Sequence, residues 1–235
     1  MVFEMLIDII TGFPGILEAP LNESMIKIGR RNGAVDFRIH DLRDFTTDKH
    51  RTIDDYPYGG GPGMVLKPEP IAEALDKVLG GLKQDSFKIL MPSPRGEKFD
   101  QALATKLSLE NHLIFLCGHY KGIDERILEL YPVREISVGD YILSSGEVAS
   151  LVIIDSIVRL LPGVLKDIDS AWTDSFSDQL LDAPYYTRPE SFKDIRVPEV
   201  LISGDHKKIA DWRQDQKIKI TRERRPDLYE KYKKQ

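Results

Sequence analysis

The sequence predicts an α/β protein with a largely parallel sheet, followed by a small helical region. Apolar segments of strand character alternate with segments of helical period through most of the 235 residues, and this alternation is typical of parallel sheets. The charge is uneven. Residues 186–235 contain 14 of the 33 Lys and Arg residues but only 9 of the 38 Asp and Glu residues, so this end carries +5 in a chain of net charge −5.

Five strands are predicted from runs of β-branched and other apolar residues, at 2–12, 34–40, 87–91, 113–117 and 134–138. Helices are predicted from apolar spacing and from start and stop signals, at 14–31, 70–79, 97–109, 123–131 and 146–161. Gly and Pro dominate residues 54–63, which predicts a loop. The last helix opens with Ser144 and Glu147 in capping-box spacing and is apolar nearly all round, so we expect it in a core or a subunit interface.

The C-terminal part is predicted to be a separate domain. Residues 164–178 are polar and acidic without a helical or strand period, which indicates a mobile linker. Helices are predicted at 205–219 and 226–234, the second with Pro226 at its start. The predicted boundaries are therefore 1–163, 164–178 and 179–235. A nucleic acid would meet the basic C-terminal part, although the solvated face of charged helices explains the same charges.

Several classes of protein are disfavoured. No apolar run reaches the roughly 18 residues of a membrane span, and the first residues lack the basic segment of a signal peptide. Cys117 is the only cysteine, which excludes internal disulfides and cysteine-rich zinc sites. We therefore expect a cytoplasmic protein without a membrane partner. The histidines show no metal-ligand spacing, so no metal site is predicted, and the missing glycine fingerprints argue against a nicotinamide enzyme.

Three loops follow predicted strands, at residues 92–96, 118–122 and 137–146. Ligands of open α/β sheets bind beyond the carboxyl ends of strands, and the Gly, Ser and Pro in these loops let backbone groups approach a ligand closely. The loops fit either a site for an adenosine-type ligand or three tight turns.

Charged residues offer two further candidates. Asp155 and Arg159 lie four residues apart and so share a face of the last long helix. They form either an internal salt bridge or a site in which the arginine stabilises a developing anion. A general base is available among five aspartates, and Asp174 is favoured because an aromatic and basic segment that suits RNA follows it. The five are Asp167, Asp169, Asp174, Asp178 and Asp182.

Seven segments, in one order along the chain, resemble the bacterial tRNA (guanine-N1)-methyltransferases, the TrmD family of SPOUT methyltransferases. They are PYGGGPGM (57–64), PSPRG (92–96), YKGIDER (120–126), EISVGDYILSSGE (135–147), IDSIVRLLPGV (154–164), DSFSDQLL (174–181) and DAPYYTRP (182–189). The resemblance implies a trefoil-knotted SPOUT domain, an obligate homodimer, and methyl transfer from S-adenosyl-L-methionine to N1 of guanosine 37 in tRNA, where another guanosine precedes the target. It also implies that residues 179–235 help to hold the tRNA.

The resemblance assigns roles to particular residues. Asp174 is the implied general base, which reaches the donor held by the other subunit, and Arg159 is its partner, which stabilises charge on guanine O6. The implied tRNA-binding residues are Tyr58, Gly59, Asp182 and Arg188. The implied donor pocket consists of Pro92, Ser93, Pro94 and Gly96 from the first loop, Gly118, Tyr120 and Gly122 from the second, and Ile136, Val138, Gly139, Tyr141, Leu143 and Gly146 from the third.

These residue types suit the chemistry, because guanine N1 carries a proton that a carboxylate can accept while a guanidinium stabilises the charge on O6. The chain departs from the family pattern at Lys121, where an acidic residue is usual, and at His119, Ser145 and Tyr185. Lys121 leaves magnesium dependence and direct contact with the guanine open. Two alternatives remain: an RNA-binding module without catalysis, and a related methyltransferase that acts on another base.

Overall fold

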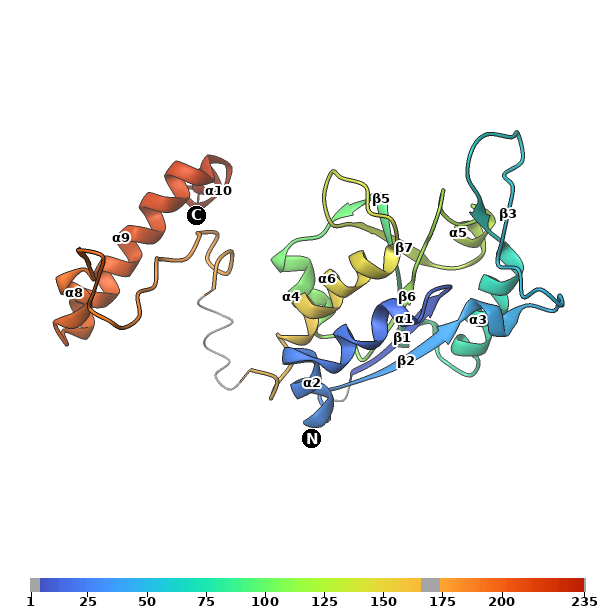
Figure 1. Ribbon diagram of the computed structural model, residues 1–235, viewed down its shortest axis with the longest axis horizontal. Helices are drawn as coiled ribbons and strands as arrows, with labels where there is room; N and C mark the ends of the chain where they lie inside the picture. The colour runs from blue at the N-terminus through green and yellow to red at the C-terminus, as the bar shows by residue number, and fades with distance from the viewer. Residues whose placement is uncertain (1–4, 166–173, 235) are drawn as a thin grey trace. The chain divides into compact units, whose positions relative to one another are not determined.

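The computed structural model describes residues 5–165 and 174–234, in two compact units, Met1–Lys166 and Asp167–Gln235. The first unit confirms the predicted α/β class, because its core is a sheet of five parallel strands (Figure 1). The strand order is β2-β1-β6-β5-β7. The strands are β1 (Met5–Thr11), β2 (Val35–Asp41), β5 (Lys88–Lys98), β6 (His112–Leu116) and β7 (Val133–Ser137). The trefoil knot stays a prediction.

Helices cover both faces of this sheet, and alternate residues of β1 separate the two cores. Ile7 and Ile9 pack in one core with side chains of α1 (Gly15–Glu18), α2 (Ser24–Arg31), α4 (Gln101–Leu107) and α6 (Gly146–Val158). Ile10 packs in the other core with side chains of α3 (Pro68–Leu79) and α5 (Arg126–Leu130). The period of two along a strand produces this division. Short elements complete the unit: β3 (Asp54–Asp55), β4 (Val65–Leu66), and the 3₁₀ turns η1 (Pro20–Asn22), η2 (Leu42–Phe45) and η3 (Gln84–Ser86).

Two predicted helices differ from the structure. The helix expected over 14–31 is divided into α1, η1 and α2, because Pro20 lacks the N–H that a continuous helix needs. The helix expected over 97–109 begins at Gln101, since β5 continues to Lys98 and pairs with β7 on both sides of a register shift between Pro92 and Glu97. Asp100 begins α4 by accepting a hydrogen bond from the Leu103 N–H at 2.9 Å.

The second unit contains α8 (Glu199–Ile202), α9 (His206–Arg224) and α10 (Pro226–Tyr232). It also contains a hairpin of β8 (Ser191–Phe192) and β9 (Ile195–Arg196) that the sequence did not predict, because two-residue strands are too short to show a period. The predicted linker, residues 164–178, is described only at its two ends. Val164 is buried in the core of the first unit, and residues 174–178 form turns in which the Phe176 N–H donates to the Leu180 carbonyl. Residues 166–173 lie outside the described residues.

Helix α6 is only partly enclosed by its own unit. Ile153, Ile154 and Ile157 are fully buried, whereas Val148 and Val152 are 43% and 47% exposed. These two valines lie four residues apart and share a face with the exposed Asp155. The helix therefore presents one partly apolar face that the residues of its own unit leave uncovered.

A buried carboxylate connects three strands at the sheet. Asp8 on β1 is 2% exposed, and its two oxygens lie 2.5 Å from Nε2 of His40 on β2 and 2.6 Å from Nε2 of His112 on β6. An ionised carboxylate only accepts hydrogen bonds, so both imidazoles donate. Burial raises the pKa of Asp8, but the hydrogen bonds from His112 and His40 outweigh it and lower the pKa to about 2.

This pKa predicts how stability depends on pH. The pKa in the folded state is below the ordinary value of 3.8, so the carboxylate stabilises the fold above about pH 4, and that contribution is lost as the pH falls towards 2. We expect Asp8→Asn to lower the free energy of unfolding by about 2 kcal/mol at pH 6 and by much less near pH 2. Urea unfolding across this range measures the difference. The exposed Asp85→Asn serves as the control, and a pH-independent cost of Asp8→Asn would contradict the assignment.

Candidate functional site

A cavity of about 570 Å³ lies where the strands β5, β6 and β7 reach their loops. Its volume is in the ordinary range for small-ligand sites. All the predicted donor-pocket residues except Gly96 line it: Pro92, Ser93, Pro94, Gly118, Tyr120, Gly122, Ile136, Val138, Gly139, Tyr141, Leu143 and Gly146. The structure thus brings together three loops that are far apart in the sequence, beyond the carboxyl ends of the strands, where ligands of open α/β sheets bind.

Two glycines allow the loops to approach one another. Gly96 does not line the cavity; a Cβ atom there would lie 2.3 Å from the Ile136 nitrogen, so this position needs glycine for β5 to remain against β7. Gly146 donates its N–H to the Gly118 carbonyl at 2.8 Å, and a Cβ atom at Gly146 would lie 2.8 Å from the Gly118 nitrogen. The second and third loops are therefore in direct backbone contact.

The second loop turns sharply and packs on the segment before β4. Tyr120 has a φ of +58°, and the Gly122 N–H closes the turn by donating to the His119 carbonyl at 2.9 Å. Burial and then a hydrogen bond to Asp54 raise the pKa of the Tyr120 hydroxyl. The Lys121 N–H donates to the Met64 carbonyl, and the Lys121 side chain lines the cavity. A cationic group thus stands where the family resemblance leads us to expect an acidic one.

The cavity suits a ligand with an apolar ring and several polar groups. Apolar side chains in its wall include Ile136, Val138 and Leu143, and the glycines and serines of the loops expose backbone N–H and C=O groups. Nδ1 of His119, a lining residue, is buried and makes no hydrogen bond within residues 5–165 and 174–234. Adenine and ribose need such a mixture of apolar contact and fixed polar partners, so the residues present fit an adenosine-containing methyl donor.

Arg159 and Asp174 are not among the lining residues of this cavity. Arg159 follows the last residue of α6, whereas Gly146 begins this helix of 13 residues. At 1.5 Å per residue the two ends are about 20 Å apart. Asp174 belongs to the second unit, so this structure tests no contact between it and the cavity.

The four predicted tRNA-binding residues fall on two parts of the chain. Tyr58 is fully exposed in the loop between β3 and β4, and Gly59 beside it has a φ of +84°. Asp182 and Arg188 are in the second unit, where the Asp182 N–H donates to Oγ of Ser175 and the Asp182 carboxylate accepts from the Tyr185 hydroxyl at 2.8 Å. Asp182 thus connects the turn that begins at Asp174 with the aromatic segment after it.

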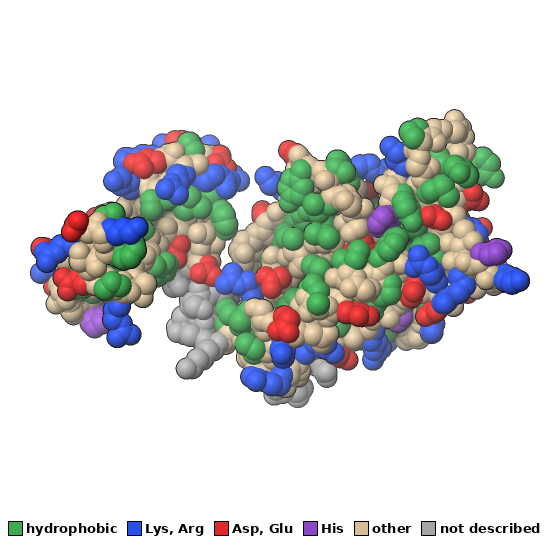
Figure 2. Space-filling view, viewed as in Figure 1, with side chains coloured by type: hydrophobic (Ala, Val, Ile, Leu, Met, Phe, Trp, Pro, Cys, Tyr) green, Lys and Arg blue, Asp and Glu red, His purple; other side chains and the backbone are tan. Residues whose placement is uncertain are grey.

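Aromatic rings and cations lie together on the second unit. The Arg213 guanidinium is 5.9 Å from the centre of the Tyr185 ring, and the rings of Tyr186 and Trp212 are 6.4 Å apart. Tyr185 and Tyr186 are 69% and 48% exposed. Figure 2 shows Lys and Arg side chains at several places on the visible face of this unit, with hydrophobic and acidic side chains between them. Such a surface offers stacking and phosphate contacts to RNA.

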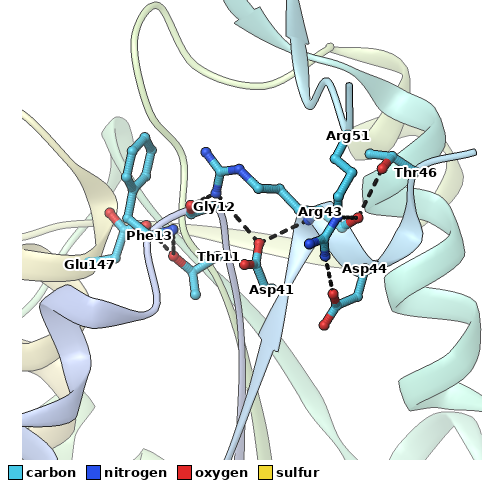
Figure 3. A network of polar contacts seen from close by, with 9 residues as sticks. All are labelled: Thr11, Gly12, Phe13, Asp41, Arg43, Asp44, Thr46, Arg51 and Glu147. Carbon is cyan, nitrogen blue, oxygen red and sulfur yellow. Dashed lines mark hydrogen bonds and ion pairs between the residues drawn. The ribbon is translucent and has the colours of Figure 1, made fainter. Parts of the chain in front are cut away.

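A polar network beside the cavity was not predicted from the sequence (Figure 3). Thr11 contacts Glu147 and Phe13, and Arg43 donates to the Gly12 carbonyl. Thr11 and Glu147 are 136 residues apart, so no local spacing could have revealed the contact. Within the part of the chain that the structure describes, no three His, Cys, Asp or Glu side chains are placed to hold a metal ion. None of the helices there is long and apolar enough to cross a membrane.

Comparison with known proteins gives a consistent result. The family model described as tRNA (Guanine-1)-methyltransferase TrmD matches residues 5–231. A protein of Geobacillus kaustophilus named tRNA (guanine-N(1)-)-methyltransferase is 50% identical over 97% of this chain and 93% of its own length. Proteins of the same name from Carboxydothermus hydrogenoformans and Methylacidiphilum infernorum are 53% and 51% identical, over 95% and 98% of this chain and 87% and 98% of their own lengths.

Proposed function

The chain belongs to the TrmD family of tRNA (guanine-1)-methyltransferases, and we propose that it transfers a methyl group from S-adenosyl-L-methionine to N1 of guanosine 37 in tRNA. The observation that carries the proposal is the cavity formed by the three loops, in a chain whose family match covers almost all of its length.

The three loops hold the donor in this proposal. Ile136, Val138 and Leu143 supply apolar contact for the adenine, and the backbone groups of residues 92–94 and 118–122 supply hydrogen bonds. When bound, the donor supplies a methyl group on a positively charged sulfur. The loops exclude water from that group and fix its direction, and orientation of this kind lowers the barrier of a transfer reaction.

In this proposal Asp174 accepts the proton of guanine N1, and Arg159 stabilises the negative charge on guanine O6. The N1 nitrogen of guanine forms a bond to the methyl carbon as the carbon–sulfur bond breaks, and that electron pair stays on the sulfur. The proton of N1 passes to the carboxylate of Asp174, which contributes roughly 10²–10⁴-fold to the rate. Arg159 stabilises the negative charge that grows on O6 during the transfer.

The length of α6 supports a site shared between two chains. Ala149 is the last residue of α6 that lines the cavity, and Arg159 follows ten residues later, about 15 Å along the helix axis. This is further than an arginine side chain reaches, so an Arg159 that serves the cavity comes from a second chain. The exposed face of α6 with Val148 and Val152 gives such a chain an apolar surface to cover. The proposed enzyme is therefore a homodimer in which Asp174 acts on the donor held by the other subunit.

Subunit complementation tests the shared site. Leu143 is 37% exposed and lines the cavity, so Leu143→Arg places a cation beside the cationic donor without disturbing a core. We expect Leu143→Arg and Asp174→Asn each to be inactive as homodimers. We expect activity to return when the two are mixed under dissociating conditions and reassembled, because one of the two sites in a heterodimer then has both functions. Absence of any recovery in heterodimers isolated by two affinity tags would contradict the shared site.

The tRNA contacts are proposed on both parts of the chain. Tyr58 and Gly59 lie on an exposed loop of the first unit, and Asp182 and Arg188 lie in the second unit. The +5 balance of residues 186–235 adds attraction for phosphates, which should weaken as salt increases. A catalytically silent RNA-binding protein would show the same salt dependence, so binding alone does not distinguish the two.

Transfer of radiolabelled methyl groups to a tRNA transcript tests the function. We expect labelling of a transcript with guanosine at position 37, no labelling of the same transcript with adenosine there, and 1-methylguanosine as the product by mass. No labelling of either transcript, with binding retained, would favour the RNA-binding alternative. Equal labelling of both would favour a methyltransferase that acts on another base.

A further inference from the structure

We infer that Glu147 is a positioning residue for the donor pocket, which acts on the second loop through Thr11 and Phe13. The inference rests on the proposed function, because it concerns the cavity assigned to the donor. Glu147 does not line that cavity, so it makes no contact with a ligand there. Its effect should therefore be on the affinity for the donor and not on the chemical step.

Glu147 is an unusual group to find in a protein core. It is completely buried in the first turn of α6. Its Oε1 accepts a hydrogen bond from the Thr11 hydroxyl at 2.5 Å, and its Oε2 has no hydrogen-bond partner within residues 5–165 and 174–234. Burial of a carboxylate is costly, and the positive end of the helix dipole offsets only part of that cost. The hydrogen bond from Thr11 therefore fixes the positions of the Glu147 carboxylate and the Thr11 hydroxyl relative to each other.

Thr11 transmits the position of Glu147 to the turn that follows β1. The Thr11 hydroxyl has a single hydrogen, which it donates to Glu147, and its oxygen accepts the Phe13 N–H at 2.8 Å. Figure 3 shows Thr11 next to these two residues. The position of the Phe13 backbone is thus fixed relative to the start of α6, where the third loop ends.

Phe13 in turn supports two residues that line the cavity. Its ring centre is 4.3 Å from that of His119 and 6.4 Å from that of Tyr120. The Arg43 guanidinium lies 5.4 Å from the centre of the Phe13 ring and donates to the Gly12 carbonyl, which restrains the turn from a further side. Tyr120 holds a φ of +58°, a conformation that a tyrosine keeps only when its surroundings impose it.

The geometry therefore connects Glu147 to Tyr120 through Thr11 and Phe13. Glu147 and Gly146 both lie in the first turn of α6, and Gly146 donates its N–H to the Gly118 carbonyl of the second loop. A shift of this end of α6 would therefore move the second and third loops together. Loss of the Thr11 hydrogen bonds allows Phe13 to move away from the rings of His119 and Tyr120, which it contacts. A pocket that must be reordered before it binds has a lower apparent affinity.

Four variants separate the hydrogen bond from the side chains that make it. Thr11→Val and Glu147→Ala remove the bond, whereas Thr11→Ser and Glu147→Gln keep a donor and an acceptor in place. We expect the first pair to raise the Kd for S-adenosylhomocysteine, measured by calorimetry on the full chain, by about tenfold. We expect the second pair to remain within about threefold of wild type, and the double variant Thr11→Val/Glu147→Ala to be no worse than either single change, because both interrupt one path.

Ile157→Ala is the matched control, because Ile157 is equally buried in α6 but lies about two turns beyond Ala149, the last residue of this helix that lines the cavity. We expect it to lower the Tm without changing the Kd. In methyl-transfer assays, Thr11→Val should raise the donor KM and leave kcat within about twofold.

Wild-type affinity in Thr11→Val and Glu147→Ala would overturn the inference, and so would equal weakening by Ile157→Ala, which would indicate a general loss of stability. If Glu147→Ala does not fold, Thr11→Val decides the question alone. If the wild-type protein does not bind S-adenosylhomocysteine, it is the proposed function that fails.

Discussion

Asp174→Asn is expected to lower the rate of methyl transfer to tRNA by at least two orders of magnitude while donor binding remains unchanged. The amide keeps the shape of the carboxylate but does not accept the proton of guanine N1 at a useful rate, and general-base catalysis is worth roughly 10²–10⁴-fold. A single-turnover assay with excess enzyme and radiolabelled donor measures the chemical step apart from tRNA release. Calorimetry with S-adenosylhomocysteine shows whether the donor pocket is intact.

Asp178→Asn provides a control within the same turn. Asp178 lies four residues further along, and its carboxylate contacts the Lys217 ammonium at 3.3 Å and accepts the Leu180 N–H. A general effect of lost negative charge in this turn would slow both variants, whereas a specific base at Asp174 predicts that Asp178→Asn stays within about fivefold of wild type. Full activity in Asp174→Asn would remove Asp174 from the proposed role.

Gly96→Ala is expected to weaken donor binding roughly a hundredfold and to destabilise the first unit. The added Cβ atom would lie 2.3 Å from the Ile136 nitrogen and 2.4 Å from the Glu135 carbonyl carbon. Both are backbone atoms of β7, so no side-chain rotation relieves the overlap and the two strands must separate. Overpacking of this kind costs roughly 1–3 kcal/mol, and displacement of the first loop by about 1 Å should weaken donor binding roughly a hundredfold. Calorimetry and urea unfolding measure the two effects.

Gly15→Ala is the matched control for the added methyl group. A Cβ atom at Gly15 would meet nothing within 4 Å, and the residue begins α1 with a φ that alanine adopts readily. We expect a change in the free energy of unfolding of less than about 1 kcal/mol and no change in donor affinity. If Gly96→Ala bound the donor as the wild type does, the first loop would not depend on close contact with β7.

The sequence predicted the parts of the fold that depend on local patterns. Apolar runs identified the five parallel strands, and loops rich in Gly, Ser and Pro after three of them offered a ligand site as one of two alternatives, the other being three tight turns. Local patterns did not predict that β5 continues past Pro92, because that pairing depends on contact with β7 through Gly96. They also did not predict the two-residue strands β8 and β9. The helix break at Pro20 carried a local signal, the missing N–H of proline, which the predicted continuous helix over 14–31 overlooked.

The buried hydrogen bonds of Asp8 and Thr11 could not be predicted from the sequence for a different reason. Asp8 meets residues 32 and 104 positions away, and Thr11 meets a residue 136 positions away. Each of these contacts requires the finished sheet. The proposed pair of Asp174 and Arg159 is a still stronger case: the resemblance named both, yet neither lines the cavity of the first unit. Their proposed roles at this cavity therefore depend on the proposed second chain.

The pairing of β5 with β7 has a consequence for the kinetics of ligand entry. Because the strand is hydrogen-bonded to its neighbour both before Pro92 and after Gly96, the intervening residues are anchored at both ends and have few alternative shapes to lose when a ligand arrives. Preorganised walls reduce the entropic penalty of association. This side of the pocket thus acts as a rigid template, against which the donor can dock in a single diffusional encounter.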